Sequence, residues 1–334
     1  MRYTAVTQIP SIVIKQGMIP EGAQITIAIP TYKRAHLLRE TLESCLAQQT
    51  NSPFAIMVVD NNPERECETE QLLREYEAIP HLFYYKNTEN LGMTGNWNKL
   101  FELAKTDFVV MLHDDDKLNE DYIDKINKVL KYYQEKLDVI YVETCVFPFV
   151  LRTLPKKQET ELKTISLTPF DFQFFNVVSI VGACFNRKSF VKMNGFNKYF
   201  DPCFDYELHL RLSKEGKAIK VLKYPLSLYR VSENYSMKMS TIFSINVKDQ
   251  EIQNSIIQNY PILYKKLFHI YQKNRELLHY IGTKRVFGVN SSEINQKIAE
   301  LKSKITFFDK LIFLGWRIFI KLHFILKPKT TIKL

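Results

Sequence analysis

The sequence predicts an α/β protein that ends in a helical region, and two patterns support this prediction. Short apolar runs alternate with amphipathic helical patterns through roughly the first two thirds of the 334 residues, as is typical of α/β folds. From Met239 onward only helical patterns remain. We therefore expect an α/β domain over residues 1–238 and a helical region with a basic amphipathic end over residues 239–334. The 46% hydrophobic content is enough for a packed core and excludes an intrinsically disordered chain.

The first three elements form a strand, a helix and a second strand. Residues 25–29 and 55–59 are continuous apolar runs of the length of a buried strand. Apolar positions at helical spacing lie between them: Leu37, Leu38, Leu42, Cys45 and Leu46. A strand–helix–strand unit of this kind predicts two parallel, buried strands.

The alternation then continues to residue 212. Further strands are predicted at 81–85, 108–112, 139–142 and 177–184, and further helices at 66–76, 95–104, 122–134, 187–193 and from Asp205 to Leu212. The polar stretch 151–168, which contains Pro155, predicts a loop. The five cysteines include no C-x-x-C pair, so we expect no zinc site and no disulfide framework.

Polar segments follow three of the predicted strands, and ligands of open parallel sheets bind beyond such strand ends. Residues 30–34 (Pro-Thr-Tyr-Lys-Arg) supply an aromatic ring and two cations, and residues 60–62 (Asp-Asn-Asn) supply a carboxylate and two amides. These groups suit the base and ribose of a nucleotide. Taken alone, Tyr32 is better explained as a surface tyrosine and Asp60 as a turn residue; only their combination favours a nucleotide site.

Three consecutive carboxylates, Asp114, Asp115 and Asp116, follow the strand at 108–112. Adjacent carboxylates repel one another unless a cation or hydrogen-bond donors balance them, and oxygen ligands suit Mg²⁺ or Mn²⁺. A divalent cation held in this way commonly also contacts substrate phosphates. The alternative is a solvated turn that caps the next helix.

A second acidic segment, Asp205-Tyr206-Glu207, precedes a helical pattern. One of its carboxylates could act as a general base that deprotonates a hydroxyl. The alternative is that both carboxylates stabilise the first turn of the helix through the helix dipole.

In their order and spacing these segments resemble family 2 glycosyltransferases of the GT-A fold, a Rossmann-like nucleotide-sugar-binding domain. The resemblance covers about residues 24–235 and rests on five segments: 27–34, 58–62, 90–93, 111–116 and 205–211, with 229–232 (Tyr-Arg-Val-Ser) in addition. It implies a metal-dependent inverting transferase that uses a nucleotide-diphosphate sugar, which we expect to be a UDP-sugar.

The resemblance also implies roles for individual residues. Tyr32 would stack on the base, Asp60 would contact the base and Asp114 would contact the ribose. The D-x-D carboxylates, Asp114 to Asp116, would hold Mn²⁺ or Mg²⁺, with Asp115 favoured as the direct ligand. The remaining nucleotide-sugar-binding residues would be Pro30, Arg34, Asn90 and Arg230.

Asp205 corresponds to the family's catalytic base, and Glu207 is the less favoured choice. Asp205 would take the proton from an acceptor hydroxyl that attacks the anomeric carbon. Two departures from the family pattern concern this region: Phe204 stands where many relatives have Glu, and Ser232 stands where many have His.

The net charge of +10 is concentrated at one end of the chain. Residues 261–334 hold 15 Lys and Arg against 4 Asp and Glu, and the rest of the chain is almost neutral. Within the apolar stretch 305–327, Lys310, Arg317 and Lys321 are spaced by seven and four residues, so they share one stripe of a helix. This pattern predicts a helix that lies on an anionic membrane surface; the alternative is a helix that packs on the catalytic domain.

No uninterrupted apolar stretch is long enough to cross a bilayer. We expect a cytoplasmic protein, peripheral at the inner face of the membrane, whose partners are the donor and a saccharide or lipid-linked acceptor, as in surface polysaccharide synthesis. Nucleic acid is not an expected partner, because the basic residues are interleaved with bulky aliphatic ones. The competing functions are a sugar-phosphate nucleotidyltransferase, although residues 30–34 lack its glycines, and a non-catalytic membrane-associated scaffold.

Overall fold

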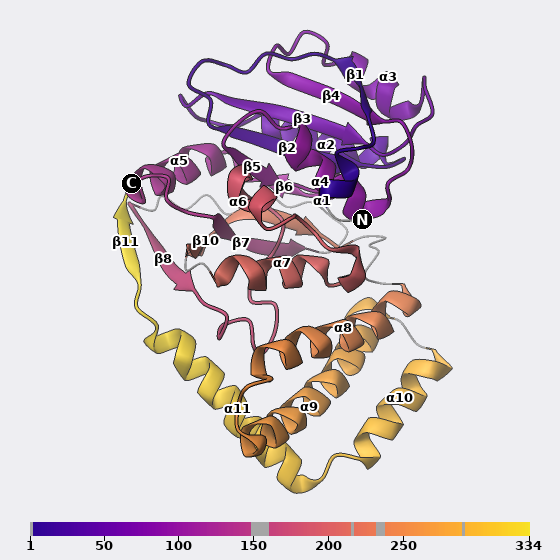
Figure 1. Ribbon diagram of the computed structural model, residues 1–334, viewed down its shortest axis with the longest axis vertical. Helices are drawn as coiled ribbons and strands as arrows, with labels where there is room; N and C mark the ends of the chain where they lie inside the picture. The colour runs from indigo at the N-terminus through magenta and orange to yellow at the C-terminus, as the bar shows by residue number, and fades with distance from the viewer. Residues whose placement is uncertain (1–2, 148–159, 215–216, 232–237, 289–290) are drawn as a thin grey trace. The chain divides into compact units, whose positions relative to one another are not determined.

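The computed structural model describes residues 3–147, 160–214, 217–231, 238–288 and 291–334. The chain divides into two compact units, coloured along the sequence in Figure 1. The sheet unit comprises residues 1–172, 176–232 and 329–334, and the helical unit comprises residues 173–175 and 233–328. Each unit is described by itself.

The sheet unit is built around one mixed sheet with the strand order β1-β4-β3-β2-β5-β9-β7-β10-β8-β11, and β6 pairs with β10 beside this path. The strands are β1 (Ser11–Lys15), β2 (Ile25–Thr31), β3 (Phe54–Asp60), β4 (Leu82–Asn87), β5 (Phe108–Met111), β6 (Lys117–Leu118), β7 (Val139–Phe147), β8 (Glu161–Leu167), β9 (Ala183–Asn186), β10 (Ala218–Arg230) and β11 (Thr330–Lys333).

Four neighbouring strands, β4, β3, β2 and β5, run parallel, as the strand–helix–strand pattern predicts. All residues of β2, β4 and β5 are buried, because helices cover a parallel sheet on both faces. The helices and the one 3₁₀ turn in the described part of this unit are α1 (Tyr3–Val6), α2 (Ala35–Leu46), α3 (Glu68–Arg74), α4 (Gly92–Leu103), α5 (Tyr122–Tyr132), α6 (Arg187–Lys192), η1 (Lys198–Phe200) and α7 (Phe204–Ser213).

The structure differs from the sequence-based prediction between residues 151 and 184. The strand predicted at 177–184 is wrong in extent, because the chain turns at Gly182, which has φ +75°. A Cβ atom at this position would lie only 3.1 Å from the side chains of Ser227 and Val142, so glycine suits the turn. The strand β9 starts only after this turn. The loop predicted at 151–168 is wrong over β8, where Leu162, Thr164, Ile165 and Leu167 are buried; residues 148–159 lie outside the described residues.

A short strand follows the helices of region 239–334, which the sequence predicts to be helical with a basic amphipathic end. Residues Thr330–Lys333 form β11, which pairs antiparallel with β8 and so belongs to the sheet unit. The β-branched residues after Pro328 favour an extended strand, and Ile332 is buried opposite Leu162.

The helical unit consists of α8 (Met239–Ile257), α9 (Ile262–Phe287), α10 (Ser292–Ser303) and α11 (Phe307–Leu326), as far as its residues are described. A small core of Ile242, Tyr280, Ile294 and Leu301 joins α8, α9 and α10. The α11 helix begins at a capping box formed by Thr306 and Asp309.

The side of α11 that faces α9 is anchored by Trp316. Its indole Nε1 donates a hydrogen bond to the Leu267 carbonyl at 3.2 Å, and its ring lies 5.4 Å from the Tyr264 ring. This side of the helix is therefore packed as in an ordinary helix–helix contact.

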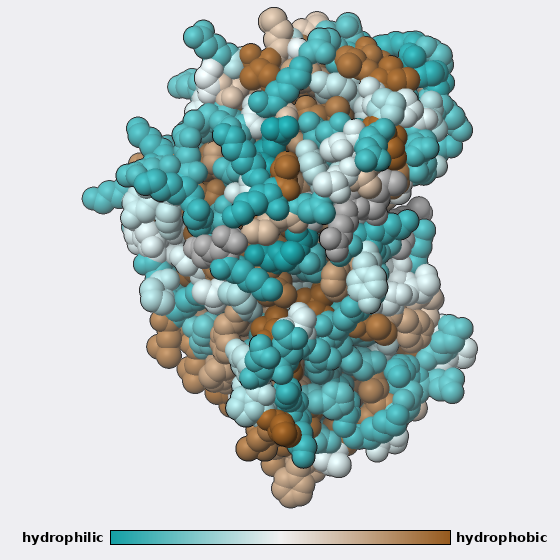
Figure 2. All heavy atoms as spheres, in the orientation of Figure 1, coloured by the Kyte–Doolittle hydropathy of each residue, from teal (hydrophilic) through white to brown (hydrophobic). Residues whose placement is uncertain are grey.

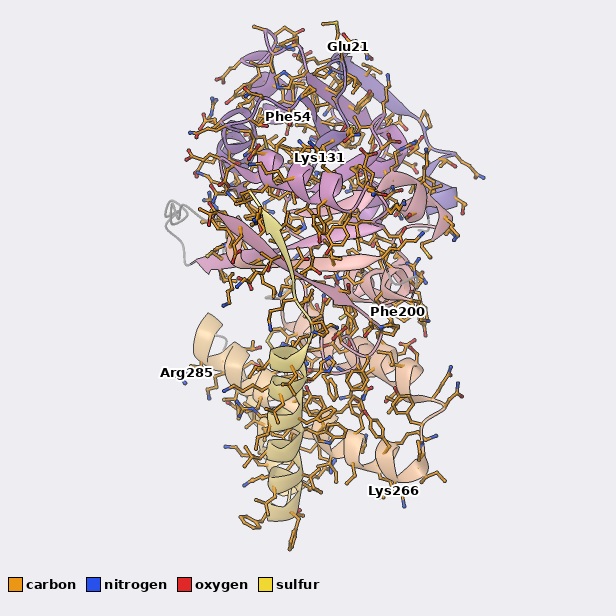
Figure 3. The ribbon with its side chains drawn as sticks, turned by 90° about the vertical axis from the view of Figure 1, so that its left-hand side faces the viewer. Glu21, Phe54, Lys131, Phe200, Lys266 and Arg285 are labelled. Atoms are coloured by element: carbon orange, nitrogen blue, oxygen red, sulfur yellow. The ribbon has the colours of Figure 1, made fainter. Side chains whose placement is uncertain are left out.

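The other side of α11 exposes an unusual amount of apolar surface, which Figure 2 shows along this helix. Figure 3 looks onto α11 in front of the other helices of its unit. Nine large apolar side chains are between 46% and 76% exposed: Phe307, Phe308, Leu311, Leu314, Ile318, Phe319, Leu322, Ile325 and Leu326. Lys310, Arg317 and Lys321 are exposed beside them. None of the described helices is long and apolar enough to cross a membrane.

Candidate active site

The polar segments predicted from the sequence come together at the carboxyl ends of β2, β3 and β5. Thr31 and Asp60 are paired in register at the ends of β2 and β3. The Thr31 hydroxyl donates a hydrogen bond of 2.8 Å to the Asp114 carboxylate, which follows β5. One edge of the parallel sheet therefore collects these groups, as expected for an open α/β sheet.

The three consecutive carboxylates point toward different partners. Arg34 spans the first two, with Nη1 at 2.9 Å from Asp114 Oδ1 and Nη2 at 2.5 Å from Asp115 Oδ2. Asp116 instead accepts the backbone N–H of Arg230 at 2.8 Å. The mutual repulsion of the run is thus relieved by separate donors.

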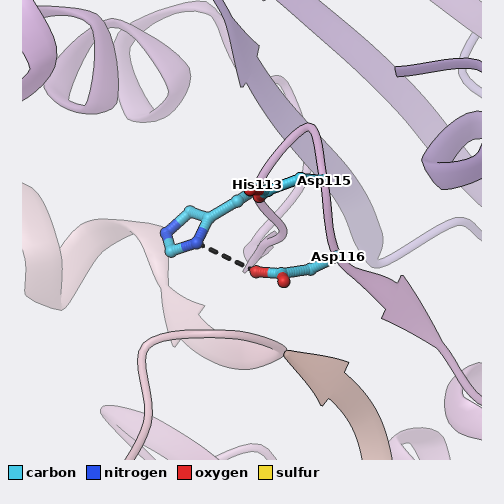
Figure 4. A group of neighbouring side chains, drawn as sticks. All are labelled: His113, Asp115 and Asp116. Atoms are coloured by element: carbon cyan, nitrogen blue, oxygen red, sulfur yellow. Dashed lines mark ion pairs between the residues drawn. The ribbon is translucent and has the colours of Figure 1, made fainter. Parts of the chain in front are cut away.

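His113, which directly precedes the run, forms a group with its second and third carboxylates. The imidazole Nδ1 of His113 lies 3.0 Å from Asp116 Oδ2, as drawn in Figure 4. One ligand atom from each of His113, Asp115 and Asp116 falls within 4.8 Å of the others. The sequence analysis did not single out His113, and it placed Asp114 among the metal ligands, whereas this group does not include Asp114.

The donor set of this group fits a divalent cation. Two carboxylates and one imidazole suit Mn²⁺ and are compatible with Mg²⁺. The Nε2 atom of His113 is buried and has no hydrogen-bond partner among the described residues. His113, Asp115 and Asp116 are therefore the residues that would hold the ion.

Burial and charge shift the pKa values of these groups. Burial raises the pKa of Asp114 to about 6, against the opposing effect of Arg34. Burial also raises the pKa of Asp116, although the hydrogen bond with His113 opposes this. For His113, burial lowers the pKa, but the hydrogen bond and charge of Asp116 outweigh burial, so the pKa is raised. A bound cation would stabilise the deprotonated carboxylates in place of these partners.

Arg230 reaches the same edge from the end of β10. Its Nε donates to the Asp115 backbone carbonyl at 3.0 Å and its Nη2 to Glu40 Oε2 at 2.8 Å. Arg230 is only 8% exposed, and Glu40 also pairs with Lys117 at 3.1 Å. Arg230 therefore fixes the backbone of the acidic run, while Ser232 lies outside the described residues.

The residues predicted to bind the nucleotide differ in their exposure. Tyr32 is 42% exposed and Asn90 is exposed, whereas Pro30 is buried within β2. Asn90 Oδ1 accepts hydrogen bonds from Asn61 Nδ2 at 2.7 Å and from the Gly92 N–H at 2.9 Å. Tyr32 thus exposes part of its ring, with Lys33 Nζ 5.8 Å from the ring centroid, and Asn90 shapes the turn that precedes α4.

Asp60 is fully buried and makes a closed set of contacts. Its Oδ2 accepts from Lys86 Nζ at 2.9 Å and from the Tyr84 hydroxyl at 3.0 Å, and its Oδ1 accepts the Asn62 N–H at 2.9 Å. Lys86 is also fully buried. These contacts organise the end of β3, and a direct contact of Asp60 with a base stays a prediction.

The second acidic segment opens α7. Asp205 is half-buried, and its Oδ2 accepts a hydrogen bond of 3.1 Å from Asn176 Nδ2. Glu207 forms a bidentate ion pair with Arg211, at 2.7 Å and 2.8 Å. Because Arg211 also binds the Gly195 carbonyl at 2.6 Å, Glu207 stabilises the structure around α7 and Asp205 is the stronger candidate for a base.

Trp97 of α4 connects the two acidic segments. Its ring stacks on the His113 ring at 4.8 Å between centroids and meets the Phe204 ring edge-on at 5.0 Å. Phe204 directly precedes Asp205, so one indole contacts both the cation-binding group and the start of α7. Neither Trp97 nor Asn176 carries a motif that the sequence alone could reveal.

Comparisons with known proteins identify the family and the fold of this chain. The family described as glycosyl transferase family 2 matches residues 26–193. Among curated proteins, an uncharacterized glycosyltransferase of Haemophilus influenzae is 23% identical over 199 residues, 57% of this chain and 62% of the relative. Glucosyl-dolichyl phosphate glucuronosyltransferase of Haloferax volcanii is 28% identical over 127 residues, 37% of this chain and 39% of the relative. Each of these matches spans less than two thirds of the relative's length.

Two solved structures share the fold. S. aureus TarS 1-349 in complex with UDP-GlcNAc has a TM-score of 0.52 at 14% identity, over 88% of this chain and 91% of that chain. Mannosyltransferase PcManGT from Pyrobaculum calidifontis, in complex with GDP-Man and Mn²⁺, has a TM-score of 0.52 at 15% identity, over 97% and 92%. The predicted GT-A fold class with C-terminal helices is confirmed, and a nucleotidyltransferase is not favoured. The chain belongs to glycosyl transferase family 2.

Proposed function

We propose that this glycosyltransferase moves a sugar, with inversion, from a UDP-sugar to a saccharide or lipid-linked saccharide acceptor, as in the synthesis of a surface polysaccharide. Support for a nucleotide-sugar donor comes from the UDP-GlcNAc and GDP-Man complexes of similar fold. Support for the site comes from one observation above all: Trp97 contacts both the His113 ring and the Phe204 ring. Through these two contacts, Trp97 links the cation-binding group to the residue that precedes the candidate base Asp205.

The leaving diphosphate would be stabilised at the acidic run. His113, Asp115 and Asp116 would hold a Mn²⁺ or Mg²⁺ ion, which would supply positive charge opposite the developing negative charge. Arg34, 32% exposed beside Asp115, supplies a second positive charge that is preorganised toward the same edge. Tyr32, with its exposed ring, would stack on the base.

Asp205 acts on the acceptor. Its carboxylate takes the proton of the acceptor hydroxyl while the hydroxyl oxygen forms a bond to the anomeric carbon and the bond to the diphosphate breaks. Attack opposite the leaving group inverts the anomeric configuration. Asp205 does not belong to the cation-binding group, so its carboxylate would stay available to the hydroxyl.

A donor panel tests this proposal. Thermal shifts with UDP, GDP and CDP, each with Mn²⁺ and with a chelator, identify the nucleotide, and product release from the matching nucleotide sugars then measures turnover. We expect UDP with Mn²⁺ to give the largest shift and a UDP-sugar to be consumed. A larger shift with another nucleotide, or turnover that survives the chelator, would contradict the donor or the metal assignment respectively.

We further propose that the protein works at the cytoplasmic face of a membrane, bound to anionic lipid through α11. The exposed apolar side chains of α11 lie beside the stripe of Lys310, Arg317 and Lys321, which suits a bilayer interface. Each basic residue near an anionic surface contributes about 1 kcal/mol.

Vesicle sedimentation tests this attachment. The full chain is expected to sediment with vesicles that contain an anionic phospholipid, and less with vesicles of a zwitterionic one. Replacing Leu314 and Ile318 together by Glu should abolish sedimentation. Val247→Glu is the matched control, because Val247 is an exposed residue of α8 at 64%. Equal sedimentation of the double variant and the control would overturn the attachment.

A further inference from the structure

Asp205 belongs to a hydrogen-bonded chain of three side chains. Asn176 donates from Nδ2 to Asp205 Oδ2 at 3.1 Å, and its Oδ1 lies 3.2 Å from Nδ1 of His209. Asp205 and His209 are four residues apart in α7, so they share one face of the helix. Asn176 thus bridges two successive turns of α7 at its N-terminal end.

The chemistry of the three groups fixes the direction of these bonds. An ionised carboxylate only accepts hydrogen bonds, so the amide must present its NH₂ group to Asp205. Its carbonyl oxygen then faces His209, which must donate from Nδ1–H. The other ring nitrogen, Nε2, is buried and has no hydrogen-bond partner among the described residues, as fits an unprotonated nitrogen in this tautomer.

The surroundings keep His209 neutral. Burial lowers the pKa of His209 to about 3. Its ring is packed among the rings of Tyr141 at 4.8 Å, Phe172 at 6.4 Å and Phe185 at 6.5 Å between centroids. A neutral imidazole in one tautomer is a fixed donor, so it holds the amide of Asn176 in one orientation at neutral pH.

The backbone next to Asn176 is also held. Lys220 of β10 donates from Nζ to the carbonyl of Val177 at 3.1 Å. Titratable side chains near this chain include Tyr141 and Glu143 of β7 and Lys220 of β10; the charge of Asp205 acts on Tyr141 and that of Glu143 acts on Lys220. The amide therefore has support from its own backbone and from the histidine.

We infer that Asn176, oriented by neutral His209, is the positioning residue that aims the Asp205 carboxylate at the acceptor hydroxyl and favours its ionised form. This inference rests on the proposed role of Asp205 as the base. Asn176 does not itself touch the reacting atoms; it acts through Asp205. Placement errors near 1 Å at a reacting group reduce rates by about 100-fold, which sets the scale of the expected effect.

A carboxyl titration tests the inference without any turnover. In protein labelled with ¹³C at the Asp carboxyl carbons, the Asp205 signal is assigned by its loss in Asp205→Asn and followed against pH. Asn176→Leu removes the donor and should move the Asp205 midpoint upward by about one pH unit. The isosteric Asn176→Asp should move it upward as well, because two carboxyl groups then share one proton. Unchanged midpoints in both variants would overturn the inference.

Kinetics with UDP-GlcNAc and UDP-glucose, with water as the acceptor, separate this inference from the proposed function. Asn176→Leu should lower kcat by about 10- to 100-fold, shift the acid limb of the kcat profile to higher pH and leave the donor KM unchanged. Asn186→Asp is the control, since it retains the capping oxygen of α6 and Asn186 is not part of the Asn176–Asp205–His209 chain. Full activity of Asn176→Leu beside an inactive Asp205→Asn would contradict the inference alone, whereas an active Asp205→Asn would contradict the base itself.

Discussion

Asp60 at the end of β3 and Asp115 just after β5 lie at the carboxyl ends of two parallel strands that flank β2, yet their surroundings are opposite. Asp60 is fully buried against Lys86, which is itself fully buried, and against Tyr84. Asp115 is paired instead with Arg34, whose side chain is 32% exposed. Position at a strand end therefore does not decide whether a carboxylate can bind a ligand; the exposure of its counter-ion does.

The largest effect is expected from a substitution of Asp115, whose partner Arg34 is partly exposed. Asp115→Asn removes a ligand of the His113–Asp115–Asp116 group, so we expect Mn²⁺-dependent release of UDP to fall by at least about 100-fold. Thermal stability without metal should change little. The variant loses the ion pair with Arg34, but it also relieves the repulsion among three adjacent carboxylates. Calorimetric titration with Mn²⁺ checks this, and wild-type affinity in the variant would show that the ion binds elsewhere.

Disrupting the buried Asp60–Lys86 pair should instead lower the stability of the protein. Lys86→Met leaves the Asp60 carboxylate buried without its cation, which should cost about 3–5 kcal/mol of unfolding free energy, measured by urea denaturation. Arg39→Met is the control, since Arg39 pairs with Glu75 at the exposed surface and should give no measurable change. If Lys86→Met were as stable as the control, the buried pair would not organise the end of β3.

His209 extends the comparison to a buried group for which the described residues supply no ion-pair partner. Its pKa is lowered to about 3 by burial, so below about pH 6.5 the unfolded chain binds a proton that the folded chain does not. Its contribution to stability is present above that pH and is lost as the pH falls toward 3, by up to about 1.4 kcal/mol per pH unit. Urea denaturation between pH 7 and pH 4 should show a shallower loss for His209→Leu than for the wild type, whereas the exposed His36→Leu should match the wild type.

The smallest effect is expected for Arg34→Lys. Lysine keeps the charge but cannot bridge Asp114 and Asp115 with two parallel bonds, so the donor KM should rise a few-fold while kcat changes less. Steady-state kinetics over a range of donor concentrations measures this. A loss confined to kcat would contradict this expectation, because it would mean that Arg34 stabilises the transition state and does not contribute to donor binding.

Much of the sheet unit could be predicted because its signals are local. The apolar runs that became β2, β3 and β5, and the polar residues that follow them, are continuous in the sequence. The division of roles within the acidic run could not be predicted, since it depends on Thr31, Arg34 and the Arg230 backbone, which reach the run from other strands and helices. His113 was overlooked beside three aspartates, although its position at the strand end was a usable signal.

Elements that depend on distant partners were also missed. The strands β8 and β11 are short and partly polar, and they are extended because they pair with each other and, for β8, with β10. Trp97 and Asn176 acquire their roles only when α4 and α7 approach the sheet edge. Sequence patterns report which face of an element is apolar and carry no information about which residues meet across the fold.

The most direct test of the account measures binding and transfer in the same variant. Asp205→Asn is titrated with UDP in the presence of Mn²⁺, and its turnover of the best UDP-sugar is measured beside the wild type. We predict nearly unchanged UDP affinity with at least about a 100-fold loss of turnover, because the base acts on the acceptor and not on the nucleotide. Wild-type turnover, or loss of UDP binding, would contradict the assignment of Asp205 as the catalytic base.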